Sequence, residues 1–198
     1  MAEEHVLVIP ESRLTELGRF SGFKQFSQSD FDALLNPEFM EFRPRSTVEE
    51  DTTVKQLIPY VLLEAEVDGK LSIFQYTRGK GQGEKRLHAL RSVGIGGHIS
   101  QEDAGSDDLY RSGMMRELEE EVCIDASYTE ELSGFIYDDT TPVGRVHLGV
   151  VHRLRLESPA AKARETEIAM SDFAAVEDLK SELDCFETWS QLCLTNLY

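Results

Sequence analysis

The stretch Arg116-Glu117-Leu118-Glu119-Glu120-Glu121 decides the interpretation of this chain. Its composition predicts a helix, in which residues three and four apart share one face. Glu117, Glu120 and Glu121 would therefore project together, with Arg116 one turn before Glu120. Adjacent carboxylates repel one another, so this face favours a bound cation, and Mg²⁺ is a usual partner of carboxylates and substrate phosphates. The alternative is that the glutamate-rich run is a solvated helix face.

The preceding sequence favours the metal-binding interpretation. Val93-Gly94-Ile95-Gly96-Gly97-His98-Ile99 comes first, a polar loop follows, and the predicted helix ends at the apolar Val122-Cys123-Ile124. This arrangement resembles the Nudix family, whose signature is Gly-x5-Glu-x7-Arg-Glu-apolar-x-Glu-Glu-x-Gly-apolar. The residues from Arg116 match the second half of that signature, and Gly96-Gly97-His98-Ile99 resembles its glycine-rich entry.

The resemblance has three departures. Counting back eight residues from Arg116 gives Asp108 where the family has Glu, and Gly97 lies eleven residues before Asp108 instead of six. The loop between Gly97 and the signature helix is therefore expected to carry five extra residues within Ser100–Asp107. Cys123 stands where the signature has its late Gly, and we expect this residue to be buried or partly buried by packing.

The resemblance implies hydrolysis of a diphosphate bond in a nucleoside diphosphate derivative, with Mg²⁺ or Mn²⁺ as cofactor. A diphosphate is multiply charged, so a metal ion that neutralises this charge and lowers the pKa of a bound water suits the reaction. The expected metal ligands are Glu117, Glu120 and Glu121. The expected catalytic residues are Glu120, Arg116 and Glu117, with Arg116 holding a glutamate through a bidentate pair.

Other candidate site residues are less sharply indicated. Arg78 begins a loop with three glycines and four basic residues, Arg78-Gly79-Lys80-Gly81-Gln82-Gly83-Glu84-Lys85-Arg86, which is either a phosphate-contacting loop or a solvated hairpin tip. The expected substrate-binding residues are Arg78, Gly96, Gly97 and His98, although a histidine there is also a common structural residue. The general base stays open among Glu120, Glu165, Glu167, Asp138 and Asp139. His147 and His152 lie five residues apart on a predicted strand and point to opposite faces, so they form no joint metal site.

Composition narrows the class of protein. The 198 residues suit one enzyme domain, and a formal charge of −17 argues against binding of nucleic acid or of anionic membranes. The three cysteines show no disulfide pattern, and neither a secretory signal nor a membrane-length apolar run is visible. We therefore expect a cytoplasmic enzyme that acts on a small-molecule nucleotide or other diphosphate. A homodimer is expected from the resemblance alone.

The order of expected elements predicts an α/β fold. The apolar run 56–65, the turn Asp68-Gly69 and the run 71–77 predict a β-hairpin. Further strands are expected at 131–137, 145–156 and 166–174, with the signature helix from about 106 to 122 and two helices after residue 174. Together with the resemblance, this predicts a Nudix-like α/β/α sandwich with a mixed sheet.

Residues 1–50 are expected to form an N-terminal extension that packs on a Nudix-like domain of residues 51–198. A short strand at 6–10 and helices at 12–17 and 29–35 are predicted there. Its many phenylalanines predict a side layer packed against the main domain, with a lid, a dimer surface or a base-stacking wall as alternatives.

Two other function classes stay open. The first is a catalytically silent Nudix-like domain that binds or senses a nucleotide, which the altered loop and Cys123 keep open. The second is an acidic interaction protein whose glutamate helix is only surface. The intact glutamate triad argues against the first, and the Gly-Gly-His-Ile entry argues against the second.

Overall fold

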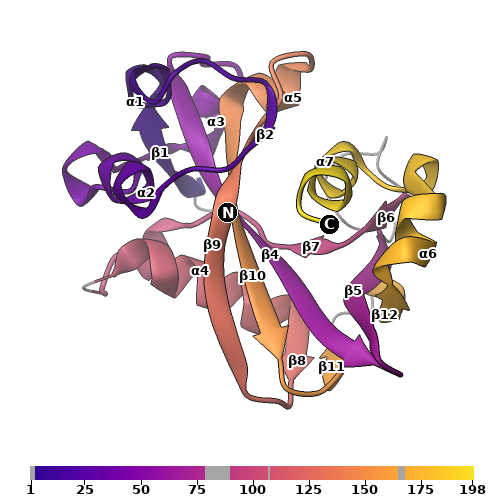
Figure 1. Ribbon diagram of the computed structural model, residues 1–198. Helices are drawn as coiled ribbons and strands as arrows, with labels where there is room; N and C mark the ends of the chain where they lie inside the picture. The colour runs from indigo at the N-terminus through magenta and orange to yellow at the C-terminus, as the bar shows by residue number, and fades with distance from the viewer. Residues whose placement is uncertain (1–2, 79–89, 107, 165–167) are drawn as a thin grey trace. The chain divides into compact units, whose positions relative to one another are not determined.

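The structure is a computed structural model that describes residues 3–78, 90–106, 108–164 and 168–198. The elements in chain order are β1 (His5–Pro10), α1 (Glu11–Glu16), β2 (Gly22–Lys24), α2 (Gln28–Leu34), β3 (Glu41–Pro44), α3 (Arg45–Val48), β4 (Val54–Val67), β5 (Lys70–Arg78), β6 (Arg91–Ser92), β7 (Gly94–Ile95), α4 (Leu109–Glu121), β8 (Val122–Ile124), β9 (Tyr128–Tyr137), α5 (Pro142–Val146), β10 (His147–Leu156), β11 (Ala161–Ala163), β12 (Ile168–Ala175), α6 (Val176–Ser181) and α7 (Thr188–Asn196) (Figure 1). Short 3-10 helices lie at Pro37–Phe39, Gln101–Asp103 and Leu183–Cys185.

The larger sheet has the strand order β12-β5-β4-β10-β9-β2, and β1 pairs with both β3 and β4. The pairs β4–β5, β5–β12 and β2–β9 are antiparallel, whereas β4 and its neighbour β10 run in the same direction in Figure 1. A smaller sheet joins β8 to β11. The prediction of an α/β fold with a mixed sheet is therefore confirmed.

The predicted hairpin is present where the turn chemistry placed it. Asp68 and Gly69 both have positive φ, at 51° and 76°, which is the backbone that a tight two-residue hairpin turn requires. One expected strand boundary is wrong, because Arg145 and Val146 belong to α5 and β10 begins only at His147. The Thr141 hydroxyl accepts a hydrogen bond from the Gly144 N–H and Pro142 occupies the first helical turn, so these residues start a helix instead.

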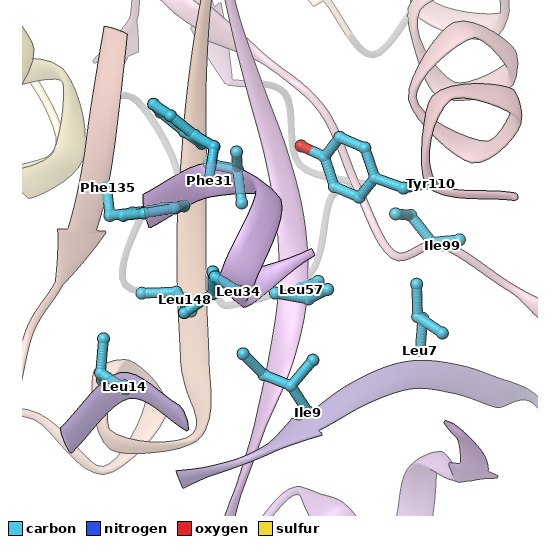
Figure 2. Packing of buried hydrophobic residues seen from close by; sticks show 11 residues of the cluster. Leu7, Ile9, Leu14, Phe31, Leu34, Leu57, Ile99, Tyr110, Phe135 and Leu148 are labelled. Carbon is cyan, nitrogen blue, oxygen red and sulfur yellow. The ribbon is translucent and has the colours of Figure 1, made fainter. Parts of the chain in front are cut away.

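The chain divides into two compact units, and each is described separately. The first unit comprises Met1–Tyr60, Gly96–Glu117 and Leu132–Val151; the second comprises Val61–Ile95, Leu118–Glu131 and His152–Tyr198. In the first unit, apolar side chains from strands and helices form one core (Figure 2). Its buried members are Leu7, Ile9, Leu14, Phe31, Leu34, Leu57, Ile99, Tyr110, Phe135, Leu148 and Val150.

The N-terminal residues are integral to the core of the first unit. Strand β1 pairs with both β3 and β4. Leu7 and Ile9 are buried in the core of Figure 2, and Val6 and Val8 are buried in a second cluster with Val48 and Val54. Phe31 lies in the core and its ring centroid is 4.6 Å from that of Phe135. Phe20, Phe26 and Phe42 are partly buried against the same core, so much of the aromatic content packs as expected.

The second unit is built on the β4–β5 hairpin and its neighbour β12, followed by α6 and α7 (yellow in Figure 1). Its most buried charge is Glu64, which is 1% exposed. Arg153 and Arg155 lie 3.5 and 3.4 Å from the Glu64 carboxylate, and the Tyr198 hydroxyl donates a hydrogen bond to it. Burial, reinforced by the charge of Glu64, raises the pKa of Tyr198, so this hydroxyl stays a donor.

Within the described residues, no helix has both the length and the apolar composition needed to cross a membrane.

Candidate functional site

Helix α4 begins later than the sequence pattern suggested. It spans Leu109–Glu121, and the Asp108 carboxylate accepts a hydrogen bond from the Arg111 N–H at 3.0 Å. Asp108 therefore caps the helix, because its side chain reaches an N–H of the first turn, and the helix starts later than the expected residue 106. The Ser106 hydroxyl accepts instead from the Asp108 N–H at 3.2 Å.

The close approach of α4 to the preceding loop depends on Gly113. A Cβ at this position would lie 2.6 Å from the Ile99 side chain and 2.9 Å from Asp103 Oδ2. Glycine in a helix interior usually weakens the helix, but here its missing side chain admits both neighbours. The helix face that carries Arg116 is thereby held against residues 99–103.

Arg116 is the organising side chain of the site. Its Nε donates to Asp103 Oδ1 at 3.0 Å and its Nη2 to Asp103 Oδ2 at 3.1 Å, which makes a bidentate pair. Nη1 donates to Glu117 Oε1 at 2.8 Å, and Nη2 also donates to the His98 carbonyl at 3.1 Å. Hydrogen bonding to Asp103, against the opposing effect of burial, raises the pKa of Arg116, so its charge is fixed. Arg116 thus donates one hydrogen bond to Glu117, whereas its bidentate partner is Asp103 and not a glutamate.

Asp103, and not Asp108, therefore holds the acidic position before the signature helix. Its side chain is only 4% exposed, and it also accepts from the Ser100 N–H at 2.9 Å. Counting back from Arg116 gave Asp108 because that count assumed an unaltered spacing between the acid and the helix. The signal for Asp103 was in the sequence, since it follows Gly97 after five residues, as the acid of the signature follows its Gly. The extra residues thus lie between Asp103 and Arg116.

The glycine pair makes room for the carboxylate and for the neighbouring strand. A Cβ on Gly97 would lie 2.3 Å from Glu117 Oε2, and a Cβ on Gly96 would lie 1.8 Å from the Pro59 carbonyl oxygen. Any larger residue at either position would have to displace its neighbour. Gly97 and Glu117 are therefore close neighbours in the structure.

The remaining glutamates of the triad follow Glu117 on the same helix at the spacing of one turn. Glu120 is exposed, whereas Glu121 is partly buried and its Oε2 atom is inaccessible to solvent. Oxygen ligands of this kind suit Mg²⁺ or Mn²⁺, so the chemistry of the set fits a hard divalent ion. Within the described ranges, however, no three His, Cys, Asp or Glu side chains are gathered so that they could hold a metal ion.

His98 forms a contact that the sequence did not indicate. Its Nε2 lies 3.2 Å from Nε2 of His147, whose Nδ1 lies 2.7 Å from the Val143 carbonyl. A hydrogen on His147 Nδ1 leaves its Nε2 as the acceptor, so His98 Nε2 is the donor. Burial, and then the charges of Arg45 and His147, lowers the pKa of His98 to about 3; burial also lowers that of His147. Both rings are neutral at pH 7.

The loop acids proposed as a general base differ in their surroundings. Asp138 is 9% exposed and accepts hydrogen bonds from the Thr140 N–H at 2.9 Å and the Thr141 hydroxyl at 3.0 Å. Burial raises the pKa of Asp138, but the hydrogen bonds outweigh it and the net shift is downward. Asp139 is exposed and accepts from the Ser21 hydroxyl at 2.6 Å. Glu165 and Glu167 lie outside the described residues, as do the Arg78 side chain and the basic loop that follows it.

His152 and Cys123 have simple surroundings. His152 Nδ1 lies 2.9 Å from Glu130 Oε1, well buried in the second unit. Cys123 is exposed, so the expectation that it is buried is wrong. It lies in the middle of β8 opposite Lys162 of β11, and a two-stranded sheet leaves this side chain in solvent.

Comparison with known proteins gives the family. No family model matches the chain. The chain is 32% identical to Protein YmaB of Bacillus subtilis (strain 168) over 202 residues, which cover 96% of this chain and 95% of YmaB. It is also 31% identical to Tm1382, a candidate Nudix hydrolase whose crystal structure gives a TM-score of 0.81 over 98% of both chains.

A more distant structure shows the same fold. The Nudix domain of Shewanella oneidensis NrtR, crystallised with ADP-ribose, has a TM-score of 0.51 at 13% identity and covers 78% of this chain and 86% of that domain. Three observations indicate the same family: the fold, the Arg116–Glu117 arrangement on α4, and the similarity over almost the whole of Tm1382. The chain belongs to the Nudix hydrolase family.

Proposed function

We propose that this protein hydrolyses the diphosphate bond of a nucleoside diphosphate derivative and that it requires a divalent metal ion. The observation that carries the proposal is the position of Arg116, which binds Asp103 and Glu117 at the same time. A guanidinium that is fixed on both sides has one geometry, and it imposes that geometry on the Glu117 carboxylate. The nucleotide class is supported by the ADP-ribose bound to the NrtR domain, which has the same fold.

Glu117, Glu120 and Glu121 are the proposed ligands of Mg²⁺ or Mn²⁺. They follow one another at i, i+3 and i+4 on α4, a spacing that places three carboxylates on one face. When bound there, the ion would supply charge neutralisation for the diphosphate and an activated water. Arg116 remains a positioning residue, since its donors already contact Asp103, Glu117 and the His98 carbonyl.

The other residues have proposed roles that follow from their contacts. Gly97 leaves space beside the Glu117 carboxylate, and Gly96 lets the loop lie against Pro59. The neutral His98 is proposed to contact substrate as an uncharged group, and Arg78 to contact a substrate phosphate. Glu120 is the proposed general base in preference to Asp138, because the hydrogen bonds that lower the pKa of Asp138 make it a weaker base. The cytoplasm is the proposed compartment, in keeping with three free cysteines, and a homodimer is the proposed assembly.

The test is a hydrolysis screen of nucleoside diphosphate derivatives with Mg²⁺, in which Glu120→Gln is compared with Glu119→Gln. Both variants remove one exposed carboxylate from neighbouring positions of α4, but only Glu120 lies on the proposed ligand face. We expect kcat to fall about 100-fold or more in Glu120→Gln, the loss typical of removing one group that stabilises the transition state, and to stay unchanged in Glu119→Gln.

Binding of Mn²⁺ to the same variants gives a readout that does not depend on turnover. Mn²⁺ affinity should fall in Glu120→Gln and stay constant in Glu119→Gln. Equal effects of both substitutions would refute the proposed ligand set. A wild-type protein that binds nucleotide but hydrolyses none of the substrates would favour the alternative of a silent nucleotide-binding domain.

A further inference from the structure

The first unit contains a cleft that lies outside α4. Two adjoining hollows of about 730 and 160 Å³ share the lining residues Glu11, Tyr137 and Asp139. The cleft is formed by the β1–α1 junction, the start of β4, the end of β9 and α5. Small-molecule sites typically have volumes of about 300–1,000 Å³, so the cleft has room for a ligand of that class.

A buried lysine forms part of the wall of the larger hollow. Lys55 is 1% exposed, and its Nζ donates to the Thr52 carbonyl at 2.7 Å, with the Val54 carbonyl at 3.4 Å. Among the described residues no carboxylate forms a salt bridge with it. The Nζ atom also lies 5.6 Å from the centroid of the Tyr137 ring. A buried ammonium without a carboxylate partner is costly, and it has three donors to satisfy. Burial lowers the pKa of Lys55 while Glu11 and Asp51 oppose the shift, so an anion in the cleft would stabilise its charged form.

A second cation lines the same hollow. Arg145 is exposed, and its Nε donates to the Asp139 carbonyl at 2.9 Å, which fixes the plane of the guanidinium. Within the described residues its two terminal nitrogens have no hydrogen bond. A guanidinium fork and an ammonium in one hollow favour an anion with several oxygens, such as a phosphate group.

The opposite end of the cleft has a different chemistry. Leu14, Phe20 and Arg19 line the smaller hollow, and the ring centroids of Phe20 and Tyr137 are 6.2 Å apart. Aromatic rings and a guanidinium plane both offer a surface on which a planar group can stack.

The acceptors between the two ends restrict the ligand further. Glu11 and Asp139 line both hollows, and their carboxylates accept hydrogen bonds from the hydroxyls of Thr15 and Ser21. A carboxylate can accept further hydrogen bonds from hydroxyl groups, but it repels an anion. A ligand that suits this lining carries its negative charge at the Lys55 end, hydroxyls in the middle and a ring at the other end.

We propose that this cleft binds a ribonucleotide, with a phosphate at Lys55 and Arg145, ribose hydroxyls at Glu11 and Asp139, and the base at Phe20 and Tyr137. The inference goes beyond the proposed hydrolysis, since it requires no residue of α4 and no metal ion. It assigns to the N-terminal region a part in ligand binding, through Glu11 and Phe20.

The test is calorimetric titration of the full chain with AMP, without metal, alongside Lys55→Met and Arg145→Gln. Methionine keeps the length of Lys55 and removes a buried charge, so the variant is expected to fold, and a thermal melt checks this. Lys162→Gln, at an exposed lysine in β11 of the second unit, is the control that alters the net charge equally. Because a hydrogen bond to a charged group has a substantial effect, each cleft variant should bind AMP about tenfold more weakly or worse, while the control is unchanged. Adenosine and inorganic phosphate, which each satisfy one end only, should bind more weakly than AMP.

The proposal is overturned if wild-type protein fails to bind AMP at millimolar concentration, or if the cleft variants bind it as the control does. Steady-state kinetics identify the source of the nucleotide. An increase in KM in Lys55→Met means that the cleft holds part of the substrate, whereas non-competitive inhibition by AMP that is lost in Lys55→Met means an effector; either result supports the site. If AMP still binds to Glu120→Gln, the cleft binds nucleotide independently of the proposed catalytic residue, whether or not the proposed hydrolysis is correct.

Discussion

Replacing Asp103 by Asn tests whether this residue, and not Asp108, fixes Arg116. The substitution keeps the size of a side chain that is 4% exposed, but it removes a charge that receives two hydrogen bonds from Arg116. Both oxygens of Asp103 accept hydrogen bonds, from Arg116 and from the Ser100 N–H. The amide N–H₂ of asparagine would replace one of these acceptors with a donor that faces another donor. Loss of one partner of a fully buried ion pair costs about 3–5 kcal/mol. Arg116 keeps Glu117 and the His98 carbonyl, so we expect a smaller loss of about 2–3 kcal/mol in the free energy of unfolding.

Urea denaturation of Asp103→Asn and of the matched variant Asp108→Asn measures this difference. Asn is as good a helix N-cap as Asp, so the exposed Asp108→Asn change should alter stability by less than about 0.5 kcal/mol. Turnover should fall about 10- to 100-fold in Asp103→Asn only, since a group that orients the proposed metal ligand Glu117 is lost. The reasoning is refuted if Asp103→Asn is as stable as the wild type, or if Asp108→Asn has the larger effect.

Two further substitutions probe the entry loop. Gly97→Ala would place a Cβ 2.3 Å from Glu117 Oε2, whereas a Cβ at Gly105 would meet nothing within 4 Å. Mn²⁺ affinity should therefore fall about 10- to 100-fold in Gly97→Ala and stay unchanged in Gly105→Ala. Titration with Mn²⁺ measures both affinities, and equal values would contradict the close approach. The pKa of His98 is lowered from 6.5 to about 3 by burial, so between these values the unfolded chain binds a proton that the folded chain does not. Stability should therefore fall as pH decreases from 6.5, by up to about 1.4 kcal/mol per pH unit more in the wild type than in His98→Gln, and denaturation curves with equal pH slopes would contradict this.

The elements that follow from short-range pattern were predictable. The long strand β4, the Asp68-Gly69 turn and β5 follow from apolar runs and from a dipeptide suited to positive φ, and the structure has all three. The helical spacing of Glu117, Glu120 and Glu121 was predictable for the same reason, because a helix fixes the face of each residue from its position alone. The start of α4 was less predictable, since serine and aspartate are both common helix caps and the sequence offers Ser106 and Asp108. In the structure the Asp108 carboxylate accepts the capping hydrogen bond from the Arg111 N–H.

Contacts between distant residues were not predictable in the same way. The partner of Arg116 is selected by where the 3-10 helix at Gln101–Asp103 lies against α4, and Gly113 permits that approach. Counting back from Arg116 gives Asp108 and counting forward from Gly97 gives Asp103, and only the contact with Arg116 decides between the two. The contact between His98 and His147 joins residues 49 positions apart, and no motif around either residue predicts the other as its partner.

The sequence by itself determined the family, the mixed α/β fold and the helical position of Glu117, Glu120 and Glu121, because these depend on local periodicity and on a short motif. The tertiary structure alone decided that Asp103 fixes Arg116, that His98 is a neutral partner of His147, and that Lys55 is a buried cation beside Tyr137 and Arg145. Charge, burial and hydrogen bonding at these positions depend on which side chains meet in space. A sequence pattern predicts such a contact only when it also predicts the path of the chain between the two residues.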